Sequence, residues 1–215
     1  MQENAGTRTE LIDVKCTLRL TSAERGGVRA PSIGNERVKT FEESIEVVDL
    51  EDASYFAADL FKECFGSAFP TPRDYLGLPH QPRGGTWHQY VAFYKWTETN
   101  IEPVGFCNWI RHGDVYLEGG MCVRRNFYRR LPKEHWSRCK QLGGVAQLVM
   151  ESAANALNDA EAWFGYCGDK KAYAVDMRIG YRPTRHPFLI VKWFREVSIM
   201  RKQELENQIA ALGPF

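Results

Sequence analysis

Apolar residues recur at spacings of three and four between Gln141 and Asn158, the pattern of a helix with one buried stripe. Two glycines, Gly143 and Gly144, stand at its start, and a strand-like run at Tyr116–Val123 precedes it. A glycine-rich turn that enters a helix presents backbone N–H groups and the positive end of the helix dipole to one point. The stretch therefore predicts a site for a phosphate or pyrophosphate. The apolar positions are Val145, Leu148, Val149, Ala153, Ala156 and Leu157.

The segments around this helix alternate between the two-residue period of strands and the longer period of helices. Asp49 or Asp52 can cap the first of the helices. The order predicts an α/β (α+β) fold, in which helices flank a mixed, mostly antiparallel sheet. Strands are expected at Ser44–Leu50, Gln89–Trp96, Pro103–Arg111, Val115–Val123, Glu161–Cys167 and Phe188–Phe194. Further helices are expected at about Ala53–Cys64, Lys170–Ile179 and Val197–Leu212.

Three segments lie outside this pattern. Residues 1–42 are polar and suggest an N-terminal arm or an extra hairpin, with one alternating strand-like stretch at Leu11–Leu20. Phe69–Gly85 is rich in glycine and proline and predicts a long loop. The basic insertion Arg124–Lys140 separates the strand from the central helix. We therefore expect a domain at 43–196, an N-terminal extension before it and a helix at 197–215 after it.

Composition limits the classes of protein that fit. The chain has 215 residues, of which 44% are hydrophobic, so it can bury a sizeable core in one domain with an appended arm. A formal charge of +1 argues against a dedicated nucleic-acid binder. No apolar run follows Met1, and none approaches the about 18 residues that span a bilayer. We therefore expect a cytoplasmic protein without a membrane partner.

The six cysteines are scattered along the chain without a C-x-x-C pair or a histidine at ligand-like spacing. This favours reduced, buried thiols over a zinc site or a disulfide framework, so no metal is expected.

The motif Gln141-x-x-Gly144-x-Ala146 resembles the Q/R-x-x-G-x-G/A pyrophosphate motif of the GNAT superfamily, the acyl-CoA-dependent N-acyltransferases. The family's closing helix has the pattern N-x-x-A-x-x-x-Y-x-x-x-G-F, and this chain is similar to it. Ala172 and Gly180-Tyr181 match that pattern, whereas Asp169 replaces the asparagine and Asp176 replaces the tyrosine. The resemblance covers about residues 43–196 in the family's order of elements.

The resemblance implies a sheet that splays around an acyl-CoA cleft, with acetyl-CoA or another acyl-CoA as co-substrate and an amine as acceptor. The acceptor class stays open between a small molecule, a peptide and a nucleic acid, and a homodimer is compatible with the family. Arg138 or Lys140 could share the role of Gln141. The donor-binding residues that the resemblance implies are Met121, Cys122, Val123, Arg124, Gln141, Gly143, Gly144, Val145 and Ala146.

The same resemblance indicates catalytic candidates. Glu118 holds a recurring base position and, by strand alternation, would share a face with Gly120 and Cys122. Asp176 stands where the family has a tyrosine that protonates the leaving thiolate, and an ordinary carboxyl is a poor acid at neutral pH unless burial raises its pKa. Tyr173 or Tyr181 could supply that proton instead, and Asp176 could grip a cationic acceptor.

Several interpretations stay open at this point. Cys122 fits a buried thiol better than a nucleophile, because neither His112 nor His135 stands at a diagnostic spacing. The arginines of the insertion could bind CoA phosphates, bind an anionic acceptor or lie in solvent. A non-catalytic acyl-CoA-binding or interaction module, and acyl transfer from an acyl carrier protein or an aminoacyl donor, are the alternative functions. The arginines concerned are Arg124, Arg125, Arg129 and Arg130.

Overall fold

The computed structural model describes residues 38–69 and 86–215. All of the described residues belong to one compact unit, residues 38–215. The strand expected at Leu11–Leu20 and all but the start of the loop expected at Phe69–Gly85 lie outside the described residues.

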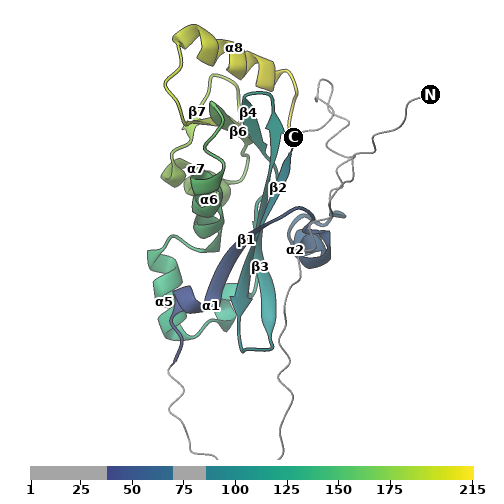
Figure 1. Ribbon diagram of the computed structural model, residues 1–215, viewed down its shortest axis with the longest axis vertical. Coiled ribbons are helices and arrows are strands. Elements are labelled where there is room, and N and C mark those ends of the chain that lie inside the picture. The colour runs from purple at the N-terminus through teal and green to yellow at the C-terminus, as the bar shows by residue number, and fades with distance from the viewer. Residues whose placement is uncertain (1–37, 70–85) are drawn as a thin grey trace, which may run out of the picture. The chain divides into compact units, whose positions relative to one another are not determined.

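An eight-stranded sheet forms the centre of the described unit, in the order β1-β2-β3-β4-β6-β8-β7, with β5 also paired to β3 (Figure 1). Only β4 and β6 pair in parallel, whereas the other neighbours are antiparallel. The mixed, mostly antiparallel sheet that the sequence predicts is therefore confirmed. The strands are β1 (Ile45–Leu50), β2 (Trp87–Lys95), β3 (Ile101–His112), β4 (Val115–Glu118), β5 (Cys122–Val123), β6 (Ala162–Tyr166), β7 (Arg182–Pro183) and β8 (Leu189–Trp193).

Helices cover both faces of this sheet. Trp109, Tyr116 and Trp163 point to the face that α6 and α7 cover, hereafter the α7 face. The alternate side chains of the strands pack under α2 at one end of the opposite face and under α8 at its other end; we call this the α2 face. The helices are α1 (Phe41–Ser44), α2 (Ser54–Phe65), α4 (Phe127–Arg130), α5 (Lys133–Gln141), α6 (Val145–Ala156), α7 (Lys170–Ile179) and α8 (Ile199–Ala210).

Short-range signals fix where these helices begin. Thr40 and Glu43 form a capping box around α1, and the Oδ1 of Asp169 accepts the N–H groups of Lys171 and Ala172 at the start of α7. The cap expected from Asp49 or Asp52 at α2 is only partly present. Asp52 accepts the N–H of Ser54, but its position lies one residue before the N-cap.

The C-terminal helix α8 belongs to the same packed unit. Leu205 and Ile209 are buried against the strand side chains of the α2 face. Arg201 forms ion pairs with Asp114, in the turn before β4, and with Glu161, just before β6. Apolar burial and these ion pairs together fasten α8 over β4 and β6.

The basic insertion folds into two helices, α4 and α5, which the sequence pattern did not indicate. Phe127 of α4 is fully buried and stacks edge-on against Tyr94 and Trp96. His135 of α5 bonds the hydroxyl of Tyr94. The insertion therefore extends the core of the α7 face.

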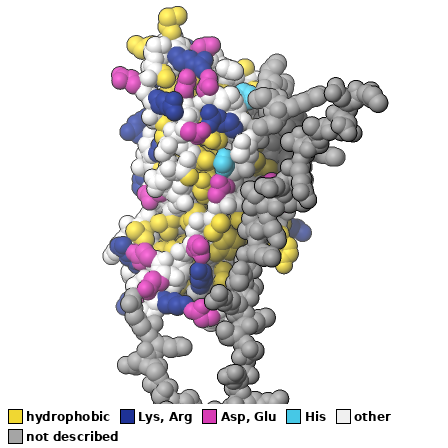
Figure 2. Space-filling view, in the orientation of Figure 1, with side chains coloured by type: hydrophobic (Ala, Val, Ile, Leu, Met, Phe, Trp, Pro, Cys, Tyr) yellow, Lys and Arg dark blue, Asp and Glu magenta, His cyan; other side chains and the backbone are white. Residues whose placement is uncertain are grey.

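The surface carries both signs of charge. On the face shown in Figure 2, lysine and arginine side chains are interspersed with aspartate and glutamate, as the near-neutral net charge leads one to expect. Among the described residues, no helix is both long and apolar enough to cross a membrane.

Candidate functional site

A one-residue bulge between β4 and β5 is the centre of the candidate site. Trp109 pairs with Glu118 and Phe106 pairs with Cys122, so a separation of four residues on β4–β5 opposes three on β3. The N–H of Gly119 still donates to the carbonyl of Asn108 at 2.8 Å. Residues 120 and 121 lie outside the ladder, which places a short irregular backbone segment where the sequence predicts donor binding.

The bulge reverses the alternation of side chains, so the prediction that Glu118 shares a face with Gly120 and Cys122 is wrong. Cys122 packs on the α2 face beside Phe61, and a side chain at Gly120 would meet the same helix. Glu118 lies instead on the α7 face, beside Trp109, its paired residue on the neighbouring strand β3. The extra residue in the strand is the physical cause.

Strands β4 and β6 part just beyond Glu118. Their parallel ladder runs from Val115 paired with Ala162 to Glu118 paired with Gly165. After that point the chain from β4 turns through the bulge towards β3, while β6 continues alongside β8. The sheet therefore opens between the bulge and the end of β6.

Two buried carboxyl groups lie at this opening. Glu118 is 7% exposed, and its Oε2 accepts the hydroxyl of Tyr181 at 2.5 Å. Asp176, from α7, is 2% exposed, and its Oδ1 has no hydrogen-bond partner among the residues described. Burial raises the pKa of Asp176 to about 6. Burial and the charge of Asp176 raise the pKa of Glu118 well above its ordinary value.

These shifts have one chemical consequence. Two carboxylates that interact in a poorly solvated site do not both ionise easily, so near neutral pH the pair retains a proton. One member can then give a proton and the other can take one. The fold therefore brings together Glu118 and Asp176, two of the residues that the sequence analysis predicts to be catalytic.

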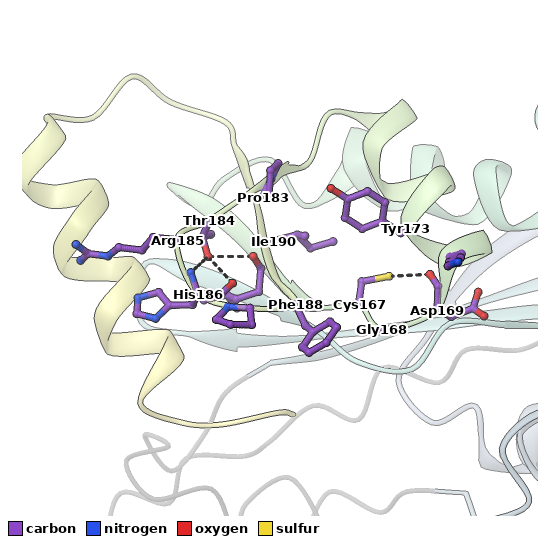
Figure 3. A pocket seen from close by; sticks show the side chains of 13 residues that line it. Cys167, Gly168, Asp169, Tyr173, Pro183, Thr184, Arg185, His186, Phe188 and Ile190 are labelled. Carbon is purple, nitrogen blue, oxygen red and sulfur yellow. Dashed lines mark hydrogen bonds between the residues drawn. The ribbon is translucent and has the colours of Figure 1, made fainter.

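A pocket of about 540 Å³ lies at the start of α7, and Figure 3 shows the residues that line it. It lies between the end of β6, the start of α7 and the loop from β7 to β8. Cys167 lines this pocket, and burial together with the nearby carboxyl of Asp176 raises the pKa of its thiol to about 12. The lining consists of Cys167, Gly168, Asp169, Lys170, Tyr173, Pro183, Thr184, Arg185, His186, Pro187, Phe188, Leu189 and Ile190.

The loop between β7 and β8 forms one wall of the pocket, and hydrogen bonds within the loop fix its conformation. Phe188 has a φ of 64°, which is rare for a bulky residue, and its side chain is 69% exposed. The Oγ1 of Thr184 donates to the carbonyl of Leu189 at 3.0 Å and accepts the N–H of His186, also at 3.0 Å. Tyr173 lines this pocket, whereas Asp176, one turn along α7, lies inward with Glu118.

Part of the backbone in the predicted pyrophosphate turn already makes hydrogen bonds within the protein. Gly143 and Gly144 have φ values of 83° and 91°, and their N–H groups donate to carbonyls of α5. The N–H of Val145 donates to the hydroxyl of Tyr128 at 3.2 Å. Ala146 and Gln147 stand at the second and third positions of α6, where N–H groups have no intrahelical acceptor.

The remaining predicted donor contacts lie around this turn. Gln141 is the last residue of α5 rather than part of α6, and its side chain is exposed. Arg138 pairs with Glu42, and Lys140 lies over the ring of Trp136.

The arginines of the insertion are largely engaged by acids. Arg124 contacts Glu63 and Glu102 at 3.2 and 3.0 Å, and Arg130 pairs with Glu102 at 2.7 Å. Arg130 also lies over the ring of Trp96. Arg129 is exposed.

Cys122 has the environment of a structural thiol. It is 6% exposed, and burial raises its pKa far above the ordinary thiol value. No group of three or more histidine, cysteine or acidic residues able to hold a metal occurs in residues 38–69 and 86–215.

Sequence reasoning missed two residues of this site, Tyr128 and Asn108. Tyr128 lies within the insertion, where no pattern pointed to α6. Asn108 lies in the middle of a strand, where no sequence motif marks its side chain as part of a site.

No protein-family model matches the chain, and no curated protein matches it by sequence. Solved structures do match. A ribosomal-protein alanine N-acetyltransferase from Escherichia coli is 10% identical with a TM-score of 0.47, covering 72% of this chain and 97% of that one. A GNAT family acetyltransferase from Brucella melitensis, in complex with acetyl-CoA, is 9% identical with a TM-score of 0.43, covering 71% and 91%. PaiA N-acetyltransferase from Thermoplasma acidophilum, in complex with coenzyme A, is 9% identical with a TM-score of 0.43, covering 70% and 99%.

The chain's own topology decides the fold. An antiparallel meander leads into a bulged strand, which pairs in parallel with β6 and then parts from it. The chain has a GNAT-like fold. The insertion that forms α4 and α5 and the carboxyl at Asp176 are the two departures from the pattern that the sequence resembles.

Proposed function

We propose that the protein is an N-acyltransferase that moves an acetyl or other short acyl group from acyl-CoA to an amine. The observation that carries the proposal is the buried pair Glu118 and Asp176 at the point where β4 and β6 part. Acyl transfer needs a place for the thioester, a base for the amine and an acid for the thiolate. The bulge and the acid pair offer these together.

In the proposed reaction, the neutral amine attacks the thioester carbonyl, so a C–N bond forms and the C–S bond breaks. The ionised member of the carboxyl pair takes the proton that the amine loses. The proton that the other member holds passes to the departing thiolate. The raised pKa of Asp176, about 6, lies much nearer to neutral pH than that of an ordinary aspartic acid, so this carboxyl can exchange a proton there.

We place the acceptor in the pocket that Cys167 lines. Its walls are mainly apolar side chains from Tyr173, Phe188 and Ile190, and it adjoins Asp176 through Cys167. Cationic side chains, Lys170 and Arg185, lie at its edge. We propose that the pocket holds an apolar part of the acceptor while its amine reaches the carboxyl pair.

One observation favours a second candidate, in which the donor is an acyl carrier protein. The N–H groups of Gly143, Gly144 and Val145 are used inside the protein, which leaves less backbone for a pyrophosphate. A carrier protein presents its acyl group on a pantetheine arm without that pyrophosphate.

Calorimetry with acetyl-CoA and acetyl-pantetheine tests the two donors. If acyl-CoA is the donor, acetyl-CoA binds much more tightly than acetyl-pantetheine, because only it carries the pyrophosphate and nucleotide. Similar affinities would favour the carrier protein. Binding of neither compound, together with the absence of co-purifying CoA in native mass spectrometry, would contradict acyl transfer.

A further inference from the structure

Asn108 of β3 is a buried polar residue that the proposed mechanism does not use. Its side chain is 0% exposed, and neither Nδ2 nor Oδ1 has a hydrogen-bond partner within residues 38–69 and 86–215. Native proteins rarely bury a side-chain amide in this way, because the lost contacts with water are not replaced. The packing of the fold alone does not account for an amide here.

Its direct cross-strand neighbour, Gln89 of β2, provides the contrast. Gln89 is 1% exposed and points to the same face. Its Oε1 accepts the N–H of Ala53 at 2.9 Å, and its Nε2 donates to the carbonyl of Glu51 at 3.2 Å. The amide of Gln89 therefore joins the start of α2 to the sheet, whereas that of Asn108 joins nothing that the structure describes.

The amide of Asn108 lies directly against the start of the bulge. A Cβ added to Gly119 would stand 2.5 Å from its Nδ2, 2.6 Å from its Oδ1 and 2.8 Å from its Cγ. Any residue other than glycine at position 119 would push the amide away. The sequence thus keeps both a polar group and the space for it beside Gly119, the first residue of the bulge.

Asn108 and the acid pair flank the bulge from opposite faces. Asn108 pairs with Gln89 on the α2 face, whereas Glu118 lies on the α7 face and Asp176 belongs to α7 itself. A group seated along the bulge would therefore have the carboxyl pair on one side and a neutral hydrogen-bond donor on the other.

We propose that Asn108 is a catalytic residue that donates a hydrogen bond from Nδ2 to the carbonyl oxygen of the acyl group bound at the bulge. This inference rests on the proposed function. Attack by the amine places negative charge on that oxygen, so the hydrogen bond strengthens as the reaction proceeds. An amide suits the task because it stays neutral and keeps its donor at every pH of interest.

The test uses the full-length protein, the ligands acetyl-CoA and CoA, and the variant Asn108→Leu. CoA lacks the acyl carbonyl, so the wild type should bind acetyl-CoA about five- to tenfold more tightly, the range expected of one hydrogen bond. Asn108→Leu should bind both ligands equally. Its turnover of acetyl-CoA should fall about 100-fold or more, as when one donor to a developing oxyanion is lost.

Thermal unfolding separates this role from a structural one. Asn108→Leu replaces an amide without partners by an apolar group of similar shape, so the ligand-free Tm should stay level or rise. Gln89→Met is the matched control, and its Tm should fall because the N–H of Ala53 and the carbonyl of Glu51 lose their hydrogen bonds. Gly119→Ala leaves the amide intact but displaces it, so it too should abolish the preference for acetyl-CoA.

Three results would overturn the inference. One is a Tm of Asn108→Leu that falls as far as that of Gln89→Met, since the amide would then be structural. Another is a preference for acetyl-CoA that survives in both Asn108→Leu and Gly119→Ala. In the third, the wild type binds neither ligand, and this result alone overturns the proposed function as well.

Discussion

The hydroxyl of Tyr181 donates to Oε2 of Glu118 at 2.5 Å and so joins the end of α7 to the last residue of β4. Tyr181 is fully buried and follows Gly180, whose φ of 106° ends the helix and turns the chain inward. This bond favours the ionised form of Glu118 and opposes the burial that raises its pKa. This hydrogen bond holds the carboxyl of Glu118 in one position.

Asp176→Asn should stabilise the protein at neutral pH. The folded-state pKa of Asp176, about 6, lies above the ordinary 3.8, so ionisation weakens the folded state and the free energy of unfolding falls as pH rises from about 4 to about 6. Removing the charge should therefore gain up to about 3 kcal/mol at pH 7.5 and little at pH 3.5. Urea unfolding at both pH values measures this difference.

The control for that experiment is Asp59→Asn, at an exposed position on α2, which should change stability little. Equal effects of Asp176→Asn at both pH values would show that Asp176 does not carry a buried charge. In the acyl-transfer assay, the wild-type rate should fall as pH drops below about 6, because the base of the pair is then protonated.

Glu118→Gln should lower the turnover of acetyl-CoA about 100-fold, the usual effect of losing one member of a general acid–base pair. The amide oxygen of glutamine can still accept from Tyr181, so the fold and the affinity for acetyl-CoA should hold. Tyr181→Phe removes only the hydroxyl, which should raise the pKa of Glu118 further and move the pH–rate profile to higher pH. A profile that does not move would separate Tyr181 from the chemistry.

Gly144→Ala should destabilise the protein by about 1–3 kcal/mol, because a φ of 91° strains any residue with a side chain. Its Cβ would also come within 3.1 Å of the hydroxyl of Tyr128. Gly168→Ala is the control, since a Cβ there meets nothing within 4 Å. Thermal unfolding of the two variants gives the comparison, and equal losses would mean that the conformation of Gly144 is not required.

Tyr128→Phe tests the donor site itself. It frees the N–H of Val145 at a cost of about 1 kcal/mol in the ligand-free protein. If a pyrophosphate lies at the start of α6, the freed donor should tighten the binding of acetyl-CoA in calorimetry. An unchanged or weaker affinity would place the pyrophosphate elsewhere.

Arg124→Ala should reduce stability by about 1 kcal/mol, because the side chain joins Glu63 of α2 to Glu102 of β3. Arg129→Ala, at an exposed position in the same insertion, is the control, and it should leave the stability unchanged. Binding of CoA and dephospho-CoA to both variants tests the remaining role. A loss specific to CoA in Arg124→Ala would show that the guanidinium also reaches the 3′-phosphate.

Much of the fold could be predicted because its signals are local. The helix at Lys170–Ile179 was predicted with the bounds that the structure has, since Asp169 caps it and Gly180 ends it. The insertion could not be predicted in this way. Phe127 and His135 are placed by contacts with Tyr94, which is distant in sequence.

The candidate site shows the same division. A strand pattern cannot count the extra residue that turns Glu118 and Cys122 to opposite faces. The spacing of Tyr173 and Asp176 put both on one helix. Only the packing of that helix shows that one lines the pocket and the other is buried with Glu118.

The fastening of α8 sets a limit on how the protein can be shortened. Leu205 and Ile209 cover apolar side chains of β4, β6 and β8, among them Leu117 and Phe164. A chain that ended before Ile199 would leave those side chains as a continuous apolar patch in water. Such patches drive copies of a protein to associate, so the shortened chain should aggregate during expression.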